Sequence, residues 1–317
     1  MRKELFMPAR DKIQQEILNA KNAAQDNIRK QYLKELNEHT KRDTILYASS
    51  FASKKLPQLP GFLISITNED IQGFMSSLNG LKGDKLDLIL HSPGGSLEAA
   101  EQIVNYLRAK YKHIRAIVPQ NAMSAATMIA CACDEIVMGK QSAIGPIDPQ
   151  ITFPTQNGHF TAPAQSIINE FNQAKAEIIA DPKVAPIWVN KIHSLPHGIL
   201  DICQNTTKLA KEKVSTWLEA YMFKGEADAK AKADKIATWL GNADLHKTHG
   251  KPICMKEAKV QGLKIVELES EQEFQDKVLS VYHATLITLE ITNCIKFIEN
   301  HDGKGWYLAV NINEKQK

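Results

Sequence analysis

The sequence predicts an α/β fold built around a parallel sheet, and three observations lead to this prediction. Residues 86–91 (LDLILH) form a continuous apolar run, which is typical of a strand buried on both faces. Further short apolar segments alternate with amphipathic segments through short connections, as in parallel sheets with right-handed crossovers. Hydrophobic residues make up 43% of the 317 positions, which is enough for a sizeable core.

The first segment, residues 1–43, is predicted to be an amphipathic helical arm. Its apolar positions recur at helical spacing, and they are Ile13, Ile17, Ala24, Ile28, Tyr32 and Leu36. Residues 1–42 contain ten Lys/Arg and six Asp/Glu, so this arm carries the positive excess of the chain. Two interpretations stay open: an arm that packs on the core or on another subunit, or a helix that lies on a membrane surface.

The second segment, residues 44–268, is predicted to be the catalytic core, with a Pro-rich connector at residues 54–61. Its expected strands are residues 62–67, 86–91, 114–118 and 135–138, with another just before residue 268. Its expected helices are residues 69–78, 96–110, a segment starting near Met123, 164–180, a Lys-rich stretch at 206–240, and a short helix from 256 to Gly262.

The third segment, residues 269–317, is predicted to be a C-terminal extension. A long amphipathic helix is expected over residues 273–297. Asp302-Gly303 lies between two apolar stretches, and such a pair predicts a β-hairpin.

Composition limits the classes of function. The net charge of +3 is too small to indicate a nucleic-acid partner. No stretch approaches the roughly 18 apolar residues that span a bilayer, and the first residues lack an apolar run of signal-peptide length. The five cysteines include no CxxC pair, so we expect buried, reduced thiols in a cytoplasmic protein that uses no metal.

Two of the predicted strands end in residues that suit catalysis. One strand runs into Gly94-Gly95, and the next runs into Ser124 at the start of a helix. The carboxyl ends of parallel strands meet at one edge of a sheet, where functional groups collect. Backbone N–H groups at a helix start can stabilise an oxyanion, although a serine there is commonly only an N-cap.

A serine nucleophile needs a base, and the sequence leaves two options open. Lys175 shares a helical stripe with Ile168, Phe171, Ile178 and Ile179, which places it on a predicted buried face where desolvation would lower its pKa. The rival candidates are histidines in or near this half of the chain, namely His91, His113, His159, His193 and His197.

Four motifs follow one another along the sequence: LDLILHSPGGSLEAAEQI, NAMSAATMIACACDEIVM, SAIGPIDPQ and KEAKVQGL. Together they resemble the serine dehydrogenase proteinase family of the Clp-protease/crotonase superfamily, which is related to signal peptide peptidase A. The resemblance covers about residues 62–268 and implies a ClpP/crotonase-like core of repeated ββα-type units.

The resemblance also implies roles for individual residues. Ser124 matches the nucleophile, the N–H groups of Gly94 and Ala125 match the oxyanion hole, and Gly95 completes the turn. Clp-type enzymes carry their histidine in the segment that here reads 142–149, which contains none. The signal-peptide-peptidase branch uses a lysine on a later helix instead, and Lys175 matches it, with Lys183 and Lys191 as fallbacks.

We therefore expect a serine peptidase that cleaves peptides or unfolded proteins and forms a homo-oligomer, without a cofactor. The dinucleotide motif GxGxxG is missing, so the sequence does not support dehydrogenase chemistry. Two alternatives stay open: a crotonase-like acyl-CoA enzyme and a non-catalytic scaffold with the same fold. Cytoplasmic location is expected, with peripheral membrane contact through the arm as a further option.

Overall fold

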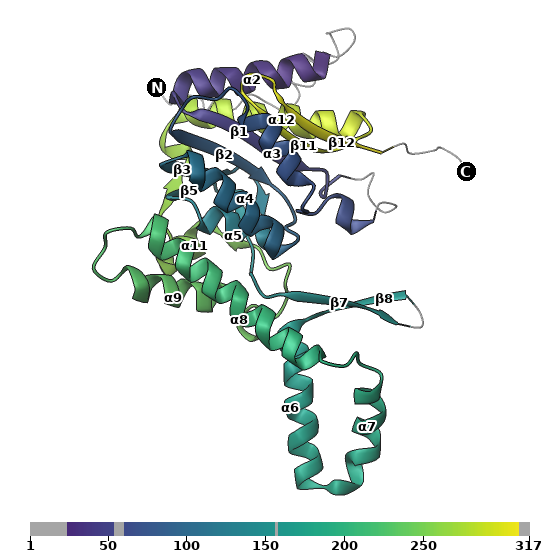
Figure 1. The fold of residues 1–317 in the computed structure, drawn as a ribbon. Coiled ribbons are helices and arrows are strands. Elements are labelled where there is room, and N and C mark those ends of the chain that lie inside the picture. Colours follow the sequence, from purple (N-terminus) through teal and green to yellow (C-terminus); the bar gives the residue numbers. More distant parts are fainter. Residues whose placement is uncertain (1–23, 54–59, 156–157, 311–317) are drawn as a thin grey trace, which may run out of the picture. The chain divides into compact units, whose positions relative to one another are not determined.

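A seven-stranded sheet in the order β10-β5-β3-β2-β1-β11-β12 organises the first of two units in the chain (Figure 1). The strands β1, β2, β3, β5 and β10 run parallel to one another, while β11 and β12 are antiparallel. The bounds are β1 Asp43–Ser49, β2 Lys85–His91, β3 His113–Val118, β5 Glu135–Met138, β10 Ile265–Glu267, β11 Cys294–Asn300 and β12 Gly305–Ala309. The prediction of an α/β fold with a parallel sheet is confirmed.

The computed structural model describes residues 24–53, 60–155 and 158–310. One unit comprises residues 1–144 and 253–317, and the other comprises residues 145–252. The predicted arm positions Ile13 and Ile17 and most of the connector at 54–61 lie outside the described residues. None of the helices within those ranges combines the length and the apolar character that crossing a membrane requires.

Helices cover both faces of the sheet (Figure 1). On one face, α2 (Ala24–Thr40) and α12 (Gln272–Ile291) pack against the strands through a shared cluster that includes Leu33, Leu46 and Val278. On the other face lie α3 (Asp70–Leu78), α4 (Leu97–Lys110) and α5 (Ala125–Cys131). The described part of the arm is therefore a packing element of the core.

The central strand β1 was not among the predicted elements. All seven residues of β1 are buried, and the strand lies between β2 and β11. The predicted helix over 273–297 was too long, because the chain leaves the helix after Ile291 and enters β11, which pairs with β1 from Lys296 onward. The predicted strand at 62–67 was wrong: residues 61–63 form a 3-10 helix, and Ile66 makes one isolated bridge. The hairpin around Asp302-Gly303 is confirmed.

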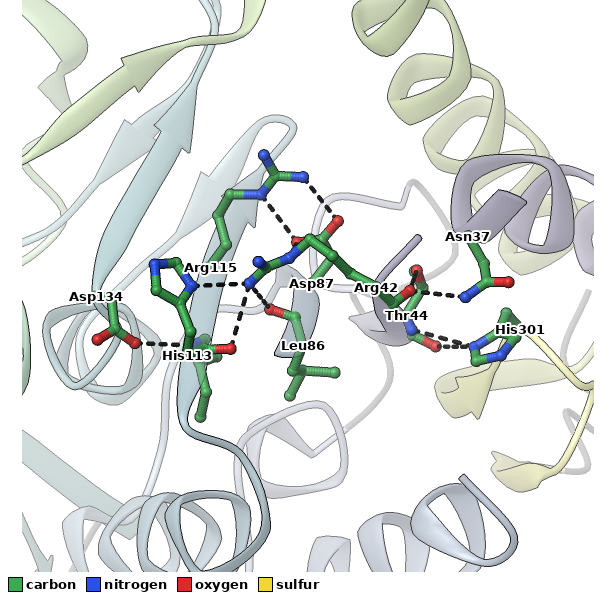
Figure 2. Close-up of polar contacts among 10 residues, drawn as sticks. Asn37, Arg42, Thr44, Leu86, Asp87, His113, Arg115, Asp134 and His301 are labelled. Carbon is green, nitrogen blue, oxygen red and sulfur yellow. Dashed lines mark hydrogen bonds and ion pairs between the residues drawn. The ribbon is translucent and has the colours of Figure 1, made fainter. Parts of the chain in front are cut away.

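A buried ionic network ties the amino ends of the parallel strands together (Figure 2). Asp87 is fully buried and accepts hydrogen bonds from Arg42 Nε at 2.6 Å and from Arg115 Nε and Nη2 at 2.9 and 2.8 Å. Arg42 also donates to the carbonyl oxygens of Leu86 and His113. These bonds join β1, β2 and β3 at the end of the sheet opposite to the turns that follow β2 and β3.

A small three-stranded sheet completes the first unit, in the order β4-β6-β9. Its strands are β4 Asn121–Ala122, β6 Ala143–Ile144 and β9 Ile253–Cys254. The short helix α11 (Met255–Gln261) follows and ends at Gly262, as predicted. Among the cysteines, the prediction of burial holds for four and is wrong for Cys254, which is exposed.

The second unit consists of a hairpin followed by helices. Strands β7 (Gln150–Thr155) and β8 (Gly158–Pro163) pair before α6 (Ala164–Ala180), whose bounds match the prediction. The remaining helices are α7 Ala185–His193, α8 Ile199–Trp217, a π-helical turn Leu218–Met222, α9 Ala229–Leu240 and α10 Ala243–His246. The predicted helical stretch over 206–240 consists of parts of two helices, α8 and α9, separated near Gly225, which adopts a φ of 82°.

Candidate active site

The turns that follow β2 and β3 are locked together by backbone hydrogen bonds. Ser92 N–H donates to the Asn121 carbonyl at 3.1 Å, and Met123 N–H donates to the Ser92 carbonyl at 2.9 Å. These bonds form a parallel bridge between Ser92 and Ala122. The prediction that the two turns lie side by side is confirmed.

Gly94 lies directly against the predicted nucleophile. A Cβ added at Gly94 would stand 2.5 Å from the Cβ of Ser124, 2.6 Å from the Met123 carbonyl oxygen and 2.9 Å from the Ala125 nitrogen. The φ of Gly94 is also positive, at 97°, which side chains rarely adopt. Only glycine therefore fits between these two turns, and its backbone borders the serine.

Ser124 occupies a strained backbone conformation at the start of α5. Its φ is 52° and its ψ is −120°, a region that residues other than glycine seldom enter. Its side chain makes no capping hydrogen bond to the helix, so the N-cap interpretation is wrong. Strained residues of this kind cluster at functional sites, where the surrounding structure maintains the strain. Ser124 as a whole residue is half-buried.

Two backbone N–H groups border Ser124. Ala125 is the first residue of α5, and the first N–H groups of a helix have no acceptor within the helix. The Gly94 N–H makes a long hydrogen bond of 3.2 Å to Ser92 Oγ. A substrate carbonyl oxygen that binds Gly94 would replace this hydroxyl. The two residues after the serine, Ala125 and Ala126, are small and buried.

Lys175 is exposed, so the prediction that it lies on a buried face was wrong. The buried positions of α6 are Ala164, Ile167 and Ala174, and Ile179 at the far end of the predicted stripe is 73% exposed. The periodicity identified a face of the helix, but within the second unit only the first half of that face is covered. Lys175 therefore lies on the uncovered part of that face.

The fallback lysines lie in the same unit. Lys183 is exposed, and Lys191 forms an ion pair with Glu170 and lies 5.4 Å from the centre of the Trp188 ring. The Lys191 amine is therefore engaged by a carboxylate and an aromatic ring of its own unit.

His91, at the end of β2, is a buried core residue. Its ring centroid lies 4.7 Å from that of Phe51 and 5.1 Å from that of Tyr282, and neither ring nitrogen has a hydrogen-bond partner among the described residues. Burial lowers the pKa of His91 to about 4, so the ring is neutral near pH 7. The other candidate histidines differ: His159, His193 and His197 are exposed, while His113 lies beside Arg42 at the opposite end of the sheet, where its ring nitrogen is 2.9 Å from the guanidinium.

The second unit contains an imidazole–carboxylate pair that the sequence analysis missed. His249 Nδ1 lies 2.9 Å from Asp148 Oδ1, and Asp148 is 3% exposed. Gln150 Nε2 donates to the other oxygen of Asp148 at 2.9 Å. A carboxylate that orients an imidazole in this way is the usual support of a general base. The two residues are 101 positions apart, and no local pattern signals their contact.

Comparisons with known proteins identify relatives of this chain. Two uncharacterized proteins of Methanocaldococcus jannaschii are 33% and 30% identical to this chain over 208 and 203 residues, 63% of this chain in each case. The matched region is 60% of the first relative and 59% of the second, so the chain spans about three-fifths of the curated relatives it matches.

Among solved structures, a membrane-bound stomatin-specific protease, crystallised as a lysine-to-alanine variant with a substrate peptide, is 17% identical to this chain. The superposition covers 78% of this chain and 84% of that one, with a TM-score of 0.40. Residues 17–299 match the ClpP-like SDH-type serine proteinases, which confirms the resemblance that the four sequence motifs indicated. The chain is a member of this family of ClpP-like SDH-type serine proteinases.

Proposed function

We propose that the chain is a serine peptidase that cleaves peptides or unfolded proteins through an acyl-enzyme on Ser124. One observation carries the proposal: Ser124 is held in a strained conformation, does not cap its helix, and lies against a glycine turn. A serine that served only the fold would relieve this strain by capping α5. Membership of the serine proteinase family supports the same conclusion.

The roles of the site residues follow from their positions. Ser124 Oγ attacks the carbonyl carbon of the scissile bond, and the N–H groups of Gly94 and Ala125 stabilise the resulting oxyanion. Gly95 completes the turn that presents Gly94. The tetrahedral intermediate then collapses, the amine leaves with a proton, and water releases the acyl group from Ser124.

Lys175 is the proposed base on the strength of the family resemblance. The neutral amine accepts the Ser124 hydroxyl proton, passes it to the leaving amine, and then accepts a proton from the hydrolytic water. Lys183 and Lys191 complete the set to be tested.

Mutagenesis separates the candidate bases. We expect Lys175→Met to abolish peptide hydrolysis, whereas His249→Asn, Lys183→Met and Lys191→Met retain it within a few-fold. An active Lys175→Met together with an inactive Lys183→Met or Lys191→Met would assign the base to that other lysine. Hydrolysis of a fluorescently labelled unfolded protein, compared between wild type and Ser124→Ala, tests the peptidase itself.

Assembly into a homo-oligomer is a separate part of the proposal. Helix α7 has no buried residue, and its Ile187 is 72% exposed, as is Ile179 on α6 at 73%. Exposed apolar side chains on a helix without buried positions are typical of a surface that packs on another subunit. Sedimentation of wild type and of Ile187→Glu measures this directly: we expect an oligomer that the glutamate weakens. A cytoplasmic location, with or without peripheral membrane contact, remains part of the same proposal.

A further inference from the structure

The glycine turn, residues 94–96, is held on its outer side by the backbone of Ile66. Ile66 N–H donates to the Gly94 carbonyl at 2.7 Å, and Ser96 N–H donates to the Ile66 carbonyl at 2.9 Å. A Cβ at Gly95 would stand 2.9 Å from the carbonyl carbon of Ile66, so this close approach requires glycine. The position of the Gly94 peptide therefore depends on the position of Ile66.

Ile66 belongs to no helix or strand, and side chains hold the residue on each side of it. Lys296 Nζ donates to the Ser65 carbonyl at 2.6 Å. Asp70 Oδ2 accepts a hydrogen bond from Thr67 N–H at 3.0 Å. The two side chains thus fix the backbone immediately before and after Ile66.

Lys296 and Asp70 also bind each other. Lys296 Nζ lies 2.9 Å from Asp70 Oδ1, and the two side chains are 2% and 0% exposed. Tyr47 on β1 donates its hydroxyl to Asp70 Oδ2 at 2.7 Å. The pair therefore connects β11, where Lys296 lies, with the first residue of α3 and with the central strand β1.

A fully buried ion pair is a poor way to stabilise a core, since apolar residues of the same volume do so without the cost of desolvating two charges. An apolar pair, however, has no group that can bind the Ser65 carbonyl or the Thr67 N–H. The specific property of the Asp70–Lys296 pair is its hold on the backbone around Ile66.

We propose that Asp70 and Lys296 are positioning residues for the oxyanion site: they fix Ile66, and Ile66 fixes the Gly94 peptide beside Ser124. Neither side chain touches the reacting atoms. The catalytic consequence rests on the proposed peptidase function. The structural consequence, an ordered Ile66 and glycine turn, does not depend on it.

The test compares two buried ion pairs that share β11. Asp70→Asn breaks the Asp70–Lys296 pair. The control Glu299→Gln breaks the Arg29–Glu299 pair, in which Arg29 Nε lies 2.5 Å from Glu299 Oε1. This control pair has no bond to residues 65–67. Two readouts are measured on the full chain: hydrogen exchange of the Ile66 and Ser96 amides, and kcat and KM for a peptide substrate.

We expect Asp70→Asn to accelerate hydrogen exchange at the Ile66 and Ser96 amides by more than the loss of global stability explains. It should also lower kcat about tenfold and change KM by no more than about twofold, because a shifted Gly94 N–H is misaligned with the oxyanion. Glu299→Gln should change exchange at these amides only as much as it changes global stability, with kcat unaltered. If Asp70→Asn does not fold, Tyr47→Phe removes one bond to the same carboxylate and should give the same pattern at smaller size.

The inference is overturned if the Asp70 or Tyr47 variant matches Glu299→Gln in both readouts. Failure of the proposed function has a different signature. In that case wild type and Glu299→Gln are both inactive, while exchange at Ile66 and Ser96 still responds to Asp70→Asn, and the positioning role stands without the peptidase.

Discussion

The backbone of Gly94 lies against the side chain of Ser124, so closely that a Cβ at Gly94 would stand 2.5 Å from the serine Cβ. Two turns from different strands thereby become one site. Gly94→Ala should lower the rate of peptide hydrolysis about 100-fold, comparable with the loss of one oxyanion donor, because the glycine turn must move away from Ser124.

The control for this substitution is Gly198→Ala. Gly198 also has a positive φ, 76°, but nothing lies within 4 Å of its added Cβ. The Gly198→Ala variant should lose only about 1 kcal/mol of stability and no activity. It therefore separates the effect of a positive φ from the effect of a steric clash with Ser124. Equal hydrolysis rates in Gly94→Ala and wild type would contradict the site described here.

The strained backbone of Ser124 predicts that two inactive variants at this position differ in their free energy of unfolding. Ser124→Gly should be about 1 kcal/mol more stable than Ser124→Ala, because only glycine adopts a φ of 52° without strain. Both variants should be inactive. Urea unfolding measures the difference, and equal midpoints for the two variants would show that Ser124 stores no strain.

Buried His91 predicts that the protein loses stability in mild acid. Its folded-state pKa of about 4 lies below the unfolded value near 6.5, so the unfolded chain binds a proton that the folded chain excludes. Stability is therefore complete above pH 6.5 and falls as the pH drops toward 4, by at most about 3 kcal/mol for this group.

Replacing His91 by Phe, which keeps a ring between Phe51 and Tyr282, should remove this share of the pH dependence. His159→Asn provides the control because His159 is exposed. Unfolding free energies from urea titrations at pH 7, 5.5 and 4.5 measure both. A wild-type pH dependence that persists unchanged in His91→Phe would contradict the assignment.

The network around Asp87 should matter for stability and not for catalysis (Figure 2). Asp87→Asn leaves Arg42 and Arg115 without their buried carboxylate, which should cost about 3 kcal/mol of stability. Asp84→Asn breaks an exposed ion pair with Lys112 and should cost less than about 1 kcal/mol. Activity per folded molecule should be unchanged in both, since the network lies at the opposite end of β2 from Gly94. Activity loss in folded Asp87→Asn would show coupling along the strand.

The contact of Gly94 with Ser124 could be predicted from the sequence because topology determines it. Each residue follows a buried parallel strand, and neighbouring parallel strands end at the same edge of the sheet. The family motifs added the roles of the residues. The strain at Ser124 was beyond prediction, because backbone angles in a turn depend on the packing around it.

Other features depend on long-range packing that a local pattern does not encode. Helical periodicity placed Lys175 on a face but does not determine what covers that face. Asp148 and His249 are 101 positions apart, and Asp70 and Lys296 are 226 apart, so their contacts exist only once the chain has folded. Strand β1 also depends on distant parts of the chain, because it pairs with β2 on one side and on the other with β11, which lies near the other end of the sequence.

The intact mass of the protein after incubation with a β-lactone, which acylates activated serines, tests most directly whether Ser124 is the nucleophile. An activated Ser124 predicts a single adduct on wild type and none on Ser124→Ala. Lack of an adduct on wild type, or an adduct that persists in Ser124→Ala, would contradict the assignment of Ser124 as the nucleophile.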